Sequence, residues 1–182
     1  ILCGRIALSA ETYDLAAVRA RQVMEIAPED PAGLLLLTAT LAKQGKQAEA
    51  LETLEEAPLT LRRKLPVLIE QLMLTQAIKG PKAILSQLET LGARHREDPL
   101  VLKALAECYS AIGQDEEAEQ TAMAALQFNT NDASLHYLAG KFQRARGQVS
   151  QAIDHLSEAI RLEPTHIEAY LELAQAYSDS RQ

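Results

Sequence analysis

The stretch Asp132–Pro164, DASLHYLAGKFQRARGQVSQAIDHLSEAIRLEP, contains the plan of two helices joined by a tight turn. Asp132 is a good N-cap for a helix that starts at Ala133. Gly147 stands where a helix commonly ends in a left-handed residue, and Pro164 closes the second helix because proline cannot continue one. Apolar residues recur at helical spacing on both sides of Gly147: Leu135, Leu138, Ala139 and Phe142 before it, and Val149, Ala152, Ile153, Leu156, Ala159 and Ile160 after it.

Glycine, alanine and proline positions of this stretch recur along the chain at intervals of 34 residues or a multiple of 34. Four columns show the period: Gly45, Gly113 and Gly147; Ala16, Ala50, Ala118 and Ala152, with Ile84 in the remaining slot; Glu29-Asp30-Pro31 and Glu97-Asp98-Pro99; and Pro28 and Pro164. Because independent columns share one period, the sequence predicts a stack of repeated helix–turn–helix units. In two units an aspartate N-cap precedes a first-turn proline.

Cut on this period, the chain is a single solenoid over residues 1–182. We expect a truncated unit at 1–30, full units at 31–64, 65–98, 99–132 and 133–166, and a terminal helix at 167–182. Strong helix formers dominate and β-branched residues never alternate, so we expect eleven helices in antiparallel pairs and no sheet. Each pair is too small to bury its own apolar face, and stacking must do so. Ile1, Leu2 and Ile6 then form an uncapped end, whereas Glu168, Glu172, Gln175 and Asp179 should give the last helix a polar face.

This pattern resembles the tetratricopeptide repeat (TPR) family. The residues that carry the resemblance are Leu105, Tyr109, Gly113, Ala118 and Ala125 in one unit, Gly140, Gly147, Ala152, Ala159 and Pro164 in the next, and Tyr170, Leu173, Ala174 and Tyr177 in the last helix. The resemblance covers nearly the whole chain, is strong over 31–57 and 99–177, and is weakest over 58–98, where Pro58 and Pro66 interrupt the helix register. It implies a right-handed superhelical solenoid of antiparallel helix pairs.

The same resemblance implies that the first helix of each unit lines a concave groove. The N-terminal half of this groove is largely apolar and comprises Ala32, Leu35, Ala39, Ala42, Lys43, Ile69, Met73, Gln76 and Ala77. The C-terminal half is polar, with three cations, and comprises Lys103, Glu107, Ser110, Tyr137, Lys141, Arg144, Glu168, Leu171 and Gln175. The alternative for the apolar half is packing against its own neighbours rather than against a partner.

The function that the resemblance implies is a protein–protein interaction scaffold, which binds a peptide or helix of a partner in the groove. The alternatives are a self-associating structural segment, a homodimer through the uncapped N-terminal end, or the scaffold of a larger enzyme whose catalytic domain is absent here. One subgroup of the family clamps the C-terminal carboxylate of chaperone tails with lysine and asparagine. Lys103 matches that clamp, but Glu107 and Leu138 replace the asparagines, so we expect no such clamp.

Composition argues against several other functions. The formal net charge of −7 disfavours a nucleic-acid surface, and no apolar run approaches the roughly 20 residues of a membrane span. No phosphate loop, nucleophile elbow or zinc-binding helix motif occurs, and His95, His136, His155 and His166 do not lie at metal-ligand spacing, so we expect no enzyme activity, cofactor or metal. We expect His136 to be a packing residue.

Three smaller features complete the expectations. Cys3 and Cys108 lie far apart at apolar positions, so we expect buried thiols rather than a disulfide. Free thiols favour the cytoplasm, but the sequence leaves the localisation unknown. Arg62-Arg63-Lys64 is either a docking element or, more simply, a solvated turn. Lys103, Lys141 and Arg144 map to one inner surface and could attract an acidic partner, unless Glu107 pairs with Lys103 or Lys141.

Overall fold

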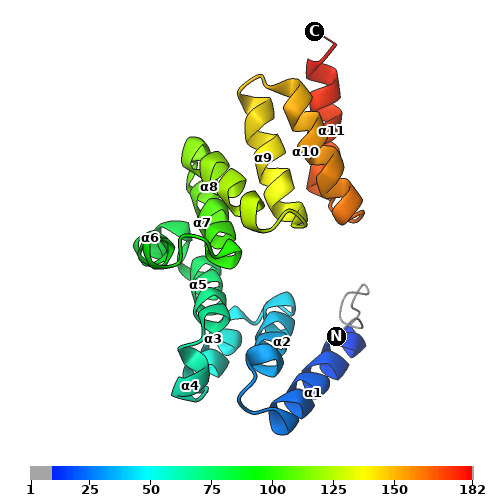
Figure 1. Cartoon of the computed structure of the whole chain (residues 1–182). Helices are drawn as coiled ribbons and strands as arrows, with labels where there is room; N and C mark the ends of the chain where they lie inside the picture. The colour runs from blue at the N-terminus through cyan, green and yellow to red at the C-terminus, as the bar shows by residue number, and fades with distance from the viewer. Residues whose placement is uncertain (1–9, 182) are drawn as a thin grey trace. The chain divides into compact units, whose positions relative to one another are not determined.

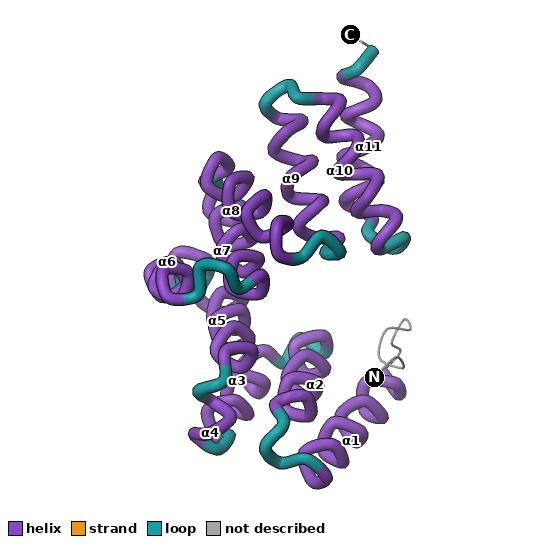
Figure 2. Tube along the Cα trace, viewed as in Figure 1, coloured by secondary structure: helices purple, strands orange, loops and turns teal. Residues whose placement is uncertain are grey.

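The computed structural model describes residues 10–181, and every regular element in that range is helical (Figures 1 and 2). The elements are α1 (Ala10–Ile26), α2 (Pro31–Lys43), α3 (Gln47–Glu56), α4 (Leu59–Arg62), α5 (Leu65–Lys79), a 3-10 turn η1 (Pro81–Ala83), α6 (Leu85–Arg94), α7 (Pro99–Ile112), α8 (Asp115–Phe128), α9 (Ala133–Ala145), α10 (Val149–Leu162) and α11 (Ile167–Asp179). The expected all-α fold is therefore confirmed. Cys3 and the end formed by Ile1, Leu2 and Ile6 lie outside the described residues.

The predicted helix boundaries rest on side-chain caps. Asp30 Oδ1 accepts a hydrogen bond from Ala32 N at 2.9 Å, and Asp98 Oδ1 accepts one from Leu100 N at 2.9 Å. Asp132 caps α9 in the same way and satisfies the amides of its first turn, which would otherwise lack partners. Left-handed glycines follow α2, α7 and α9 as expected: Gly45, Gly113 and Gly147, with φ of 79°, 80° and 77°.

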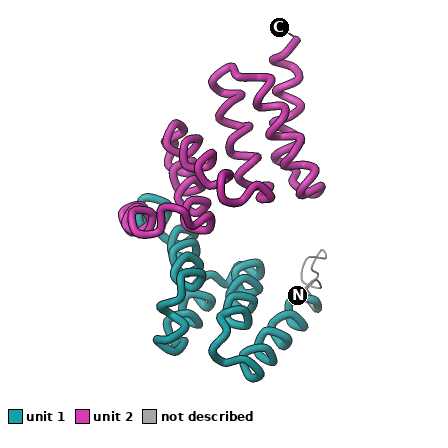
Figure 3. The backbone as a smooth tube through the Cα atoms, viewed as in Figure 1, with its two compact units in different colours: residues 1–84 teal, residues 85–182 magenta. Residues whose placement is uncertain are grey.

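The chain divides into two compact units, residues 1–84 and 85–182 (Figure 3). The boundary falls inside the segment 65–98, so that α5 belongs to unit 1 and α6 to unit 2. A glycine with φ of 86°, Gly80, and the following Pro81 end α5 and set the backbone into a 3-10 turn. Pro58 likewise separates α3 from the single turn α4. Breaker residues thus interrupt the repeat where its sequence pattern is weakest.

Small residues let the paired helices of unit 2 approach closely. Ala118, Ala152 and Ala159 are fully buried, as the alanine column predicts. A Cβ atom built on Gly140 would lie 2.6 Å from Leu156 Cγ and 3.1 Å from the carbonyl oxygen of Ala152. The close contact between α9 and α10 therefore requires a glycine at position 140 as well as the apolar side chains around it.

Unit 1 is built in the same way. Its core gathers leucines of α2, Leu34, Leu37 and Leu41, with Leu54 of α3 and Val67 of α5. Lys64, the last residue of the basic triplet, donates a hydrogen bond to the carbonyl oxygen of Glu29 in the α1–α2 turn. At least this lysine therefore has a structural role between neighbouring turns of unit 1.

Candidate protein-interaction surface

The first helices of three successive repeats lie next to one another in unit 2, because α9 contacts both α7 and α11. The predicted C-terminal groove residues are distributed over these helices. Two sets of ion pairs join them, one between α7 and the start of α9 and one between α9 and α11. We call the face that carries these pairs the inner face of unit 2.

Lys103 of α7 binds the aspartate that caps α9. Its Nζ atom lies 2.9 Å from Asp132 Oδ1 and 2.8 Å from Oδ2, so one carboxylate serves both as helix cap and as ion-pair partner. The side chains are 28% and 17% exposed, which shields the pair partly from solvent. The expected alternative of internal pairing is thus realised, with Asp132 rather than Glu107 as the direct partner.

Arg144 of α9 is held by two carboxylates of α11. Its Nε donates to Glu172 Oε2 at 2.8 Å and its Nη1 to Asp179 Oδ2 at 3.1 Å. Burial lowers the pKa of Arg144, but these hydrogen bonds and charges outweigh it and raise the pKa above its usual range. Of the four polar residues expected on α11, Glu168, Gln175 and Asp179 are exposed. The helix also exposes apolar side chains, namely Ile167, Tyr170, Leu171 and Tyr177.

Glu107 lies near the Lys103–Asp132 pair. Burial raises the pKa of its carboxyl group, Lys103 opposes that shift, and Asp132 adds to it. The upward direction shows that loss of hydration outweighs the attraction of a lysine that Asp132 already neutralises. Glu107 therefore places a partly buried acidic group on the inner face.

Tyr137 connects α9 with the start of α11. Its ring centroid lies 4.8 Å from that of His166, and His166 Nδ1 lies 3.2 Å from Glu168 Oε2. That contact lacks hydrogen-bond geometry, which leaves the buried Nδ1 atom unsatisfied. Burial raises the pKa of Tyr137, and the charges of Glu172 and Glu168 add to the shift.

The remaining predicted residues of this half keep more solvent contact. Leu171 is 60% exposed, and Gln175 is also exposed. Lys141 is half-buried, with Nζ 5.1 Å from the Phe142 ring centroid, and it makes no ion pair within residues 10–181. The structure therefore joins Arg144 to α11 and places Tyr137 near the charge of Glu168, and it leaves Leu171 and Lys141 available.

In unit 1 the predicted N-terminal groove residues are divided between α2 and α5, which contact each other. Ala39 and Lys43 are exposed, and Leu35 and Met73 are half-buried. Ile69 is only 5% exposed and offers little surface to a partner. Leu35 packs against the unit 1 core, in line with the alternative of packing against its own neighbours.

Two features were not found from the sequence. The first is a contact between His136 of α9 and His155 of α10, whose Nδ1 atoms lie 2.9 Å apart. The partner of His136 is 19 residues away on another helix, and only knowledge of the helix register could have found it.

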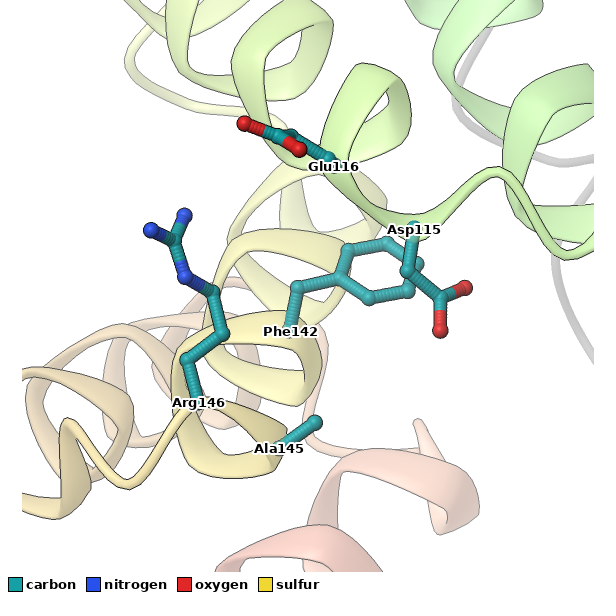
Figure 4. A pocket seen from close by; sticks show the side chains of 5 residues that line it. All are labelled: Asp115, Glu116, Phe142, Ala145 and Arg146. Carbon is teal, nitrogen blue, oxygen red and sulfur yellow. The ribbon is translucent and has the colours of Figure 1, made fainter.

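The second is an open cavity of about 350 Å³ between the start of α8 and the end of α9, lined by Asp115, Glu116, Phe142, Ala145 and Arg146. Figure 4 shows Glu116 and Arg146 on one side of the Phe142 ring and Asp115 on the other. Arg146 Nη1 also lies 2.6 Å from Oε2 of the buried Glu119. None of the predicted site residues lines this cavity.

The described residues contain neither a metal-binding cluster nor a membrane-spanning helix. No cluster of three or more His, Cys, Asp and Glu side chains is placed to hold a metal ion in residues 10–181. In the same range, no helix combines the length and apolar character that a membrane span needs. Cys108 is buried, and burial and the charge of Glu89 raise the pKa of its thiol.

Comparison with known proteins places these helix pairs in a familiar architecture. A family model described as TPR repeat matches residues 140–180, which span the end of α9, α10 and α11. No curated protein matches the sequence significantly.

Several solved structures share the fold. A thermophilic TPR protein of Thermus thermophilus is 18% identical, with a TM-score of 0.71 over 92% of this chain and 91% of that one. YrrB, described as a TPR protein with an unusual peptide-binding site, is 17% identical, with a TM-score of 0.55 over 88% of this chain and 82% of its own. Human IFIT1, solved as a dimer with m7Gppp-AAAA, is 18% identical, with a TM-score of 0.71 over 94% of this chain and 44% of its own.

The 34-residue columns, the caps and close helix contacts that they produce, the family match at 140–180 and the shared fold agree with one another. Residues 140–180 therefore match the tetratricopeptide-repeat family model, and the chain shares the fold of solved tetratricopeptide-repeat proteins.

Proposed function

We propose that the chain is a protein-interaction module and that the inner face of unit 2 binds a peptide or helical segment of a partner. The observation that carries the proposal is the 60% exposure of Leu171, a large apolar side chain on α11 that is next in sequence to Glu172, the partner of Arg144 of α9. The pairs fix the positions of the three first helices before a partner arrives, and a preorganised surface loses less entropy on binding. A peptide-binding site is also the feature for which YrrB is described.

The charge of the inner face favours a basic partner. Of the three cations expected to attract an acidic ligand, Lys103 and Arg144 are taken up by carboxylates, which leaves Lys141. The face carries three cations, Lys103, Lys141 and Arg144, against five carboxylates, Glu107, Asp132, Glu168, Glu172 and Asp179, a net of −2 when all are ionised.

The surrounding unit has the same sign. Residues 85–182 hold 8 Lys and Arg against 15 Asp and Glu, a net of −7, whereas residues 1–84 hold 10 of each. A face of this sign repels RNA, the ligand class found with IFIT1, and attracts lysine- and arginine-rich segments. The earlier expectation of an acidic partner is replaced for this reason.

The proposal is tested by selecting peptides from a random library on the whole chain and measuring their affinity at two salt concentrations. We expect enrichment of peptides with an apolar anchor flanked by basic residues, bound more weakly at high salt. Leu171→Lys should weaken binding by about tenfold or more, since it removes the anchor contact and adds a like charge.

Met123→Lys is the matched control, because Met123 is 37% exposed and lies on the second helix α8, outside the predicted groove positions. It should bind the selected peptides like the unaltered chain. Peptides without basic enrichment, or equal affinity for the two variants, would contradict the proposed surface.

A further inference from the structure

The contact between His136 and His155 joins the two helices of one repeat. The two Nδ1 atoms are 2.9 Å apart and the ring centroids 5.1 Å apart, so the imidazoles meet end to end, as an N–H···N hydrogen bond requires. On its other side, His136 Nε2 lies 3.0 Å from the carbonyl oxygen of Thr130 in the α8–α9 turn. We propose that His136 and His155 share one proton between their Nδ1 atoms, and that this pair fastens α10 to α9 at neutral pH and releases it in acid.

The hydrogen-bond partners fix the proton positions. A carbonyl oxygen only accepts, so His136 Nε2 must carry a hydrogen and donate it to Thr130. In the neutral ring His136 Nδ1 is then bare, and it accepts the hydrogen of His155 Nδ1. After one proton is added, one ring is an imidazolium and the other is neutral. The contact is kept, because the Nδ1–H of the imidazolium donates to the bare Nδ1 of the neutral ring. A second added proton leaves both Nδ1 atoms with a hydrogen and no lone pair between them, so the contact must break.

The electrostatic surroundings support this order of events. Burial lowers the pKa of His155, His136 lowers it further, and the neighbouring Asp154 on α10 opposes both. Glu158, one turn further along α10, also acts on His136, but Arg161 already holds its carboxylate with hydrogen bonds of 2.7 and 2.6 Å. Asp132, one turn before His136 on α9, is likewise occupied by Lys103 and by the first amides of the helix. Glu158 and Asp132 are therefore already paired with other groups, and the charge of Asp154 does not reverse the downward shift of the His155 pKa.

The direction of the pH effect follows from linkage. The pKa of His155 lies below its ordinary value of 6.5 in the folded chain, so the unfolded chain binds more protons in mild acid. The stability that the pair contributes is fully present above pH 6.5 and is lost as the pH falls through the lower folded pKa. The loss should be concentrated in α9 and α10, which the pair joins. Because α11 packs against α10, the inner face should loosen with them, a consequence that rests on the proposed function.

The test compares thermal unfolding of the whole chain at about pH 8 and about pH 5, the range in which histidine changes its charge. We expect a drop in Tm on acidification that is largely abolished in His155→Gln, whose side chain stays neutral. His95→Gln and His166→Gln are the controls. His95 is exposed, and His166 lies near Tyr137 rather than in the pair, so both variants should keep the drop.

A direct measurement removes any dependence on how the variants fold. Long-range ¹H–¹⁵N spectra of the histidine side chains in the unaltered chain should show a bare Nδ1 on His136 and a protonated Nδ1 on His155 near neutral pH. The two titrations should be coupled. Independent titrations with the midpoints of the unfolded chain, or a His155→Gln variant that keeps the full acid loss, would overturn the proposal. Neither readout involves a binding partner, so failure of the peptide selection would leave this result standing.

Discussion

At the scale of single residues, Gly140 shows how a missing side chain sets the distance between helices. The nearest obstacles to a Cβ atom there are Leu156 Cγ at 2.6 Å and the carbonyl oxygen of Ala152 at 3.1 Å. Leu156 is fully buried and has little room to move. Gly140→Ala should therefore destabilise the chain by about 1–3 kcal/mol in urea unfolding, because overpacking exceeds the gain in helix propensity.

Gly92, in the last turn of α6, is the matched comparison for Gly140. A Cβ atom there would meet only Leu105 Cδ2, at 3.3 Å, the end of a flexible side chain. Gly92→Ala should be neutral or stabilising by up to about 1 kcal/mol, since alanine favours a helix. If both glycine variants lose the same stability, packing at Gly140 is not the cause.

Glu107 carries a second prediction at this scale. Burial raises its folded pKa above the ordinary value of 4.5, so the ionised carboxylate opposes folding. The neutral form supports folding fully below pH 4.5, and that support is lost as the pH rises through the higher folded pKa. Glu107→Gln should therefore raise the free energy of unfolding at neutral pH, and the gain should shrink in acid.

Glu168→Gln is the control for Glu107, since the Glu168 side chain is 67% exposed and is not expected to share the effect. Urea unfolding of both variants near neutral pH and in acid makes the comparison. A Glu107 variant that is less stable at neutral pH would show that its attraction to Lys103 exceeds its cost of burial.

At the scale of helices, Asp132 combines two functions that substitutions can separate. Asp132→Asn keeps a side chain that can cap α9 but loses the ion pair with Lys103, so it should cost about 0–1 kcal/mol. Asp132→Ala loses the cap as well and should cost about 0.5–2 kcal/mol more. Asp30→Ala removes only a cap, with no ion pair, and its loss in thermal or urea unfolding provides the reference. Equal losses for the two Asp132 variants would mean that the cap contributes nothing.

The same scale shows what the sequence could predict. Helix starts at Asp30, Asp98 and Asp132 and the turns at Gly45, Gly113 and Gly147 follow from local rules, because capping and left-handed backbone involve only a few neighbouring residues. The partner of Lys103 could not be predicted in this way. Lys103 can reach Glu107 on its own helix and Asp132 at the start of α9, and the choice depends on the distance between two packed helices. The His136–His155 contact was missed for the same reason.

At the scale of the whole molecule, the repeat period predicts the helix pairs but not the division of the chain. The alanine column at 16, 50, 118 and 152 is broken only within 58–98, where Ile84 fills the slot and Pro58, Gly80 and Pro81 stand among helix-forming residues. The boundary between the compact units falls there, between α5 and α6. The net charge also differs between the two units: it is zero in residues 1–84 and −7 in residues 85–182.

This division predicts that a destabilising substitution in one unit lowers amide protection in that unit and not in the other. Ala50 of α3 and Ala152 of α10 occupy the same repeat column, and both are fully buried, one in each unit. A leucine at either position should overpack its own helix pair and cost about 1–3 kcal/mol. Because a helical repeat mainly contacts its neighbours, the weakened protection should spread no further than adjacent helices.

Hydrogen exchange followed by mass spectrometry on the whole chain measures this directly. Ala152→Leu should speed amide exchange in α9, α10 and α11 and leave α1, α2 and α3 unchanged, whereas Ala50→Leu should do the reverse. Each variant is thereby the control for the other, at matched positions of the repeat. Faster exchange throughout α1 to α11 with either substitution would show that residues 10–181 unfold as one cooperative body.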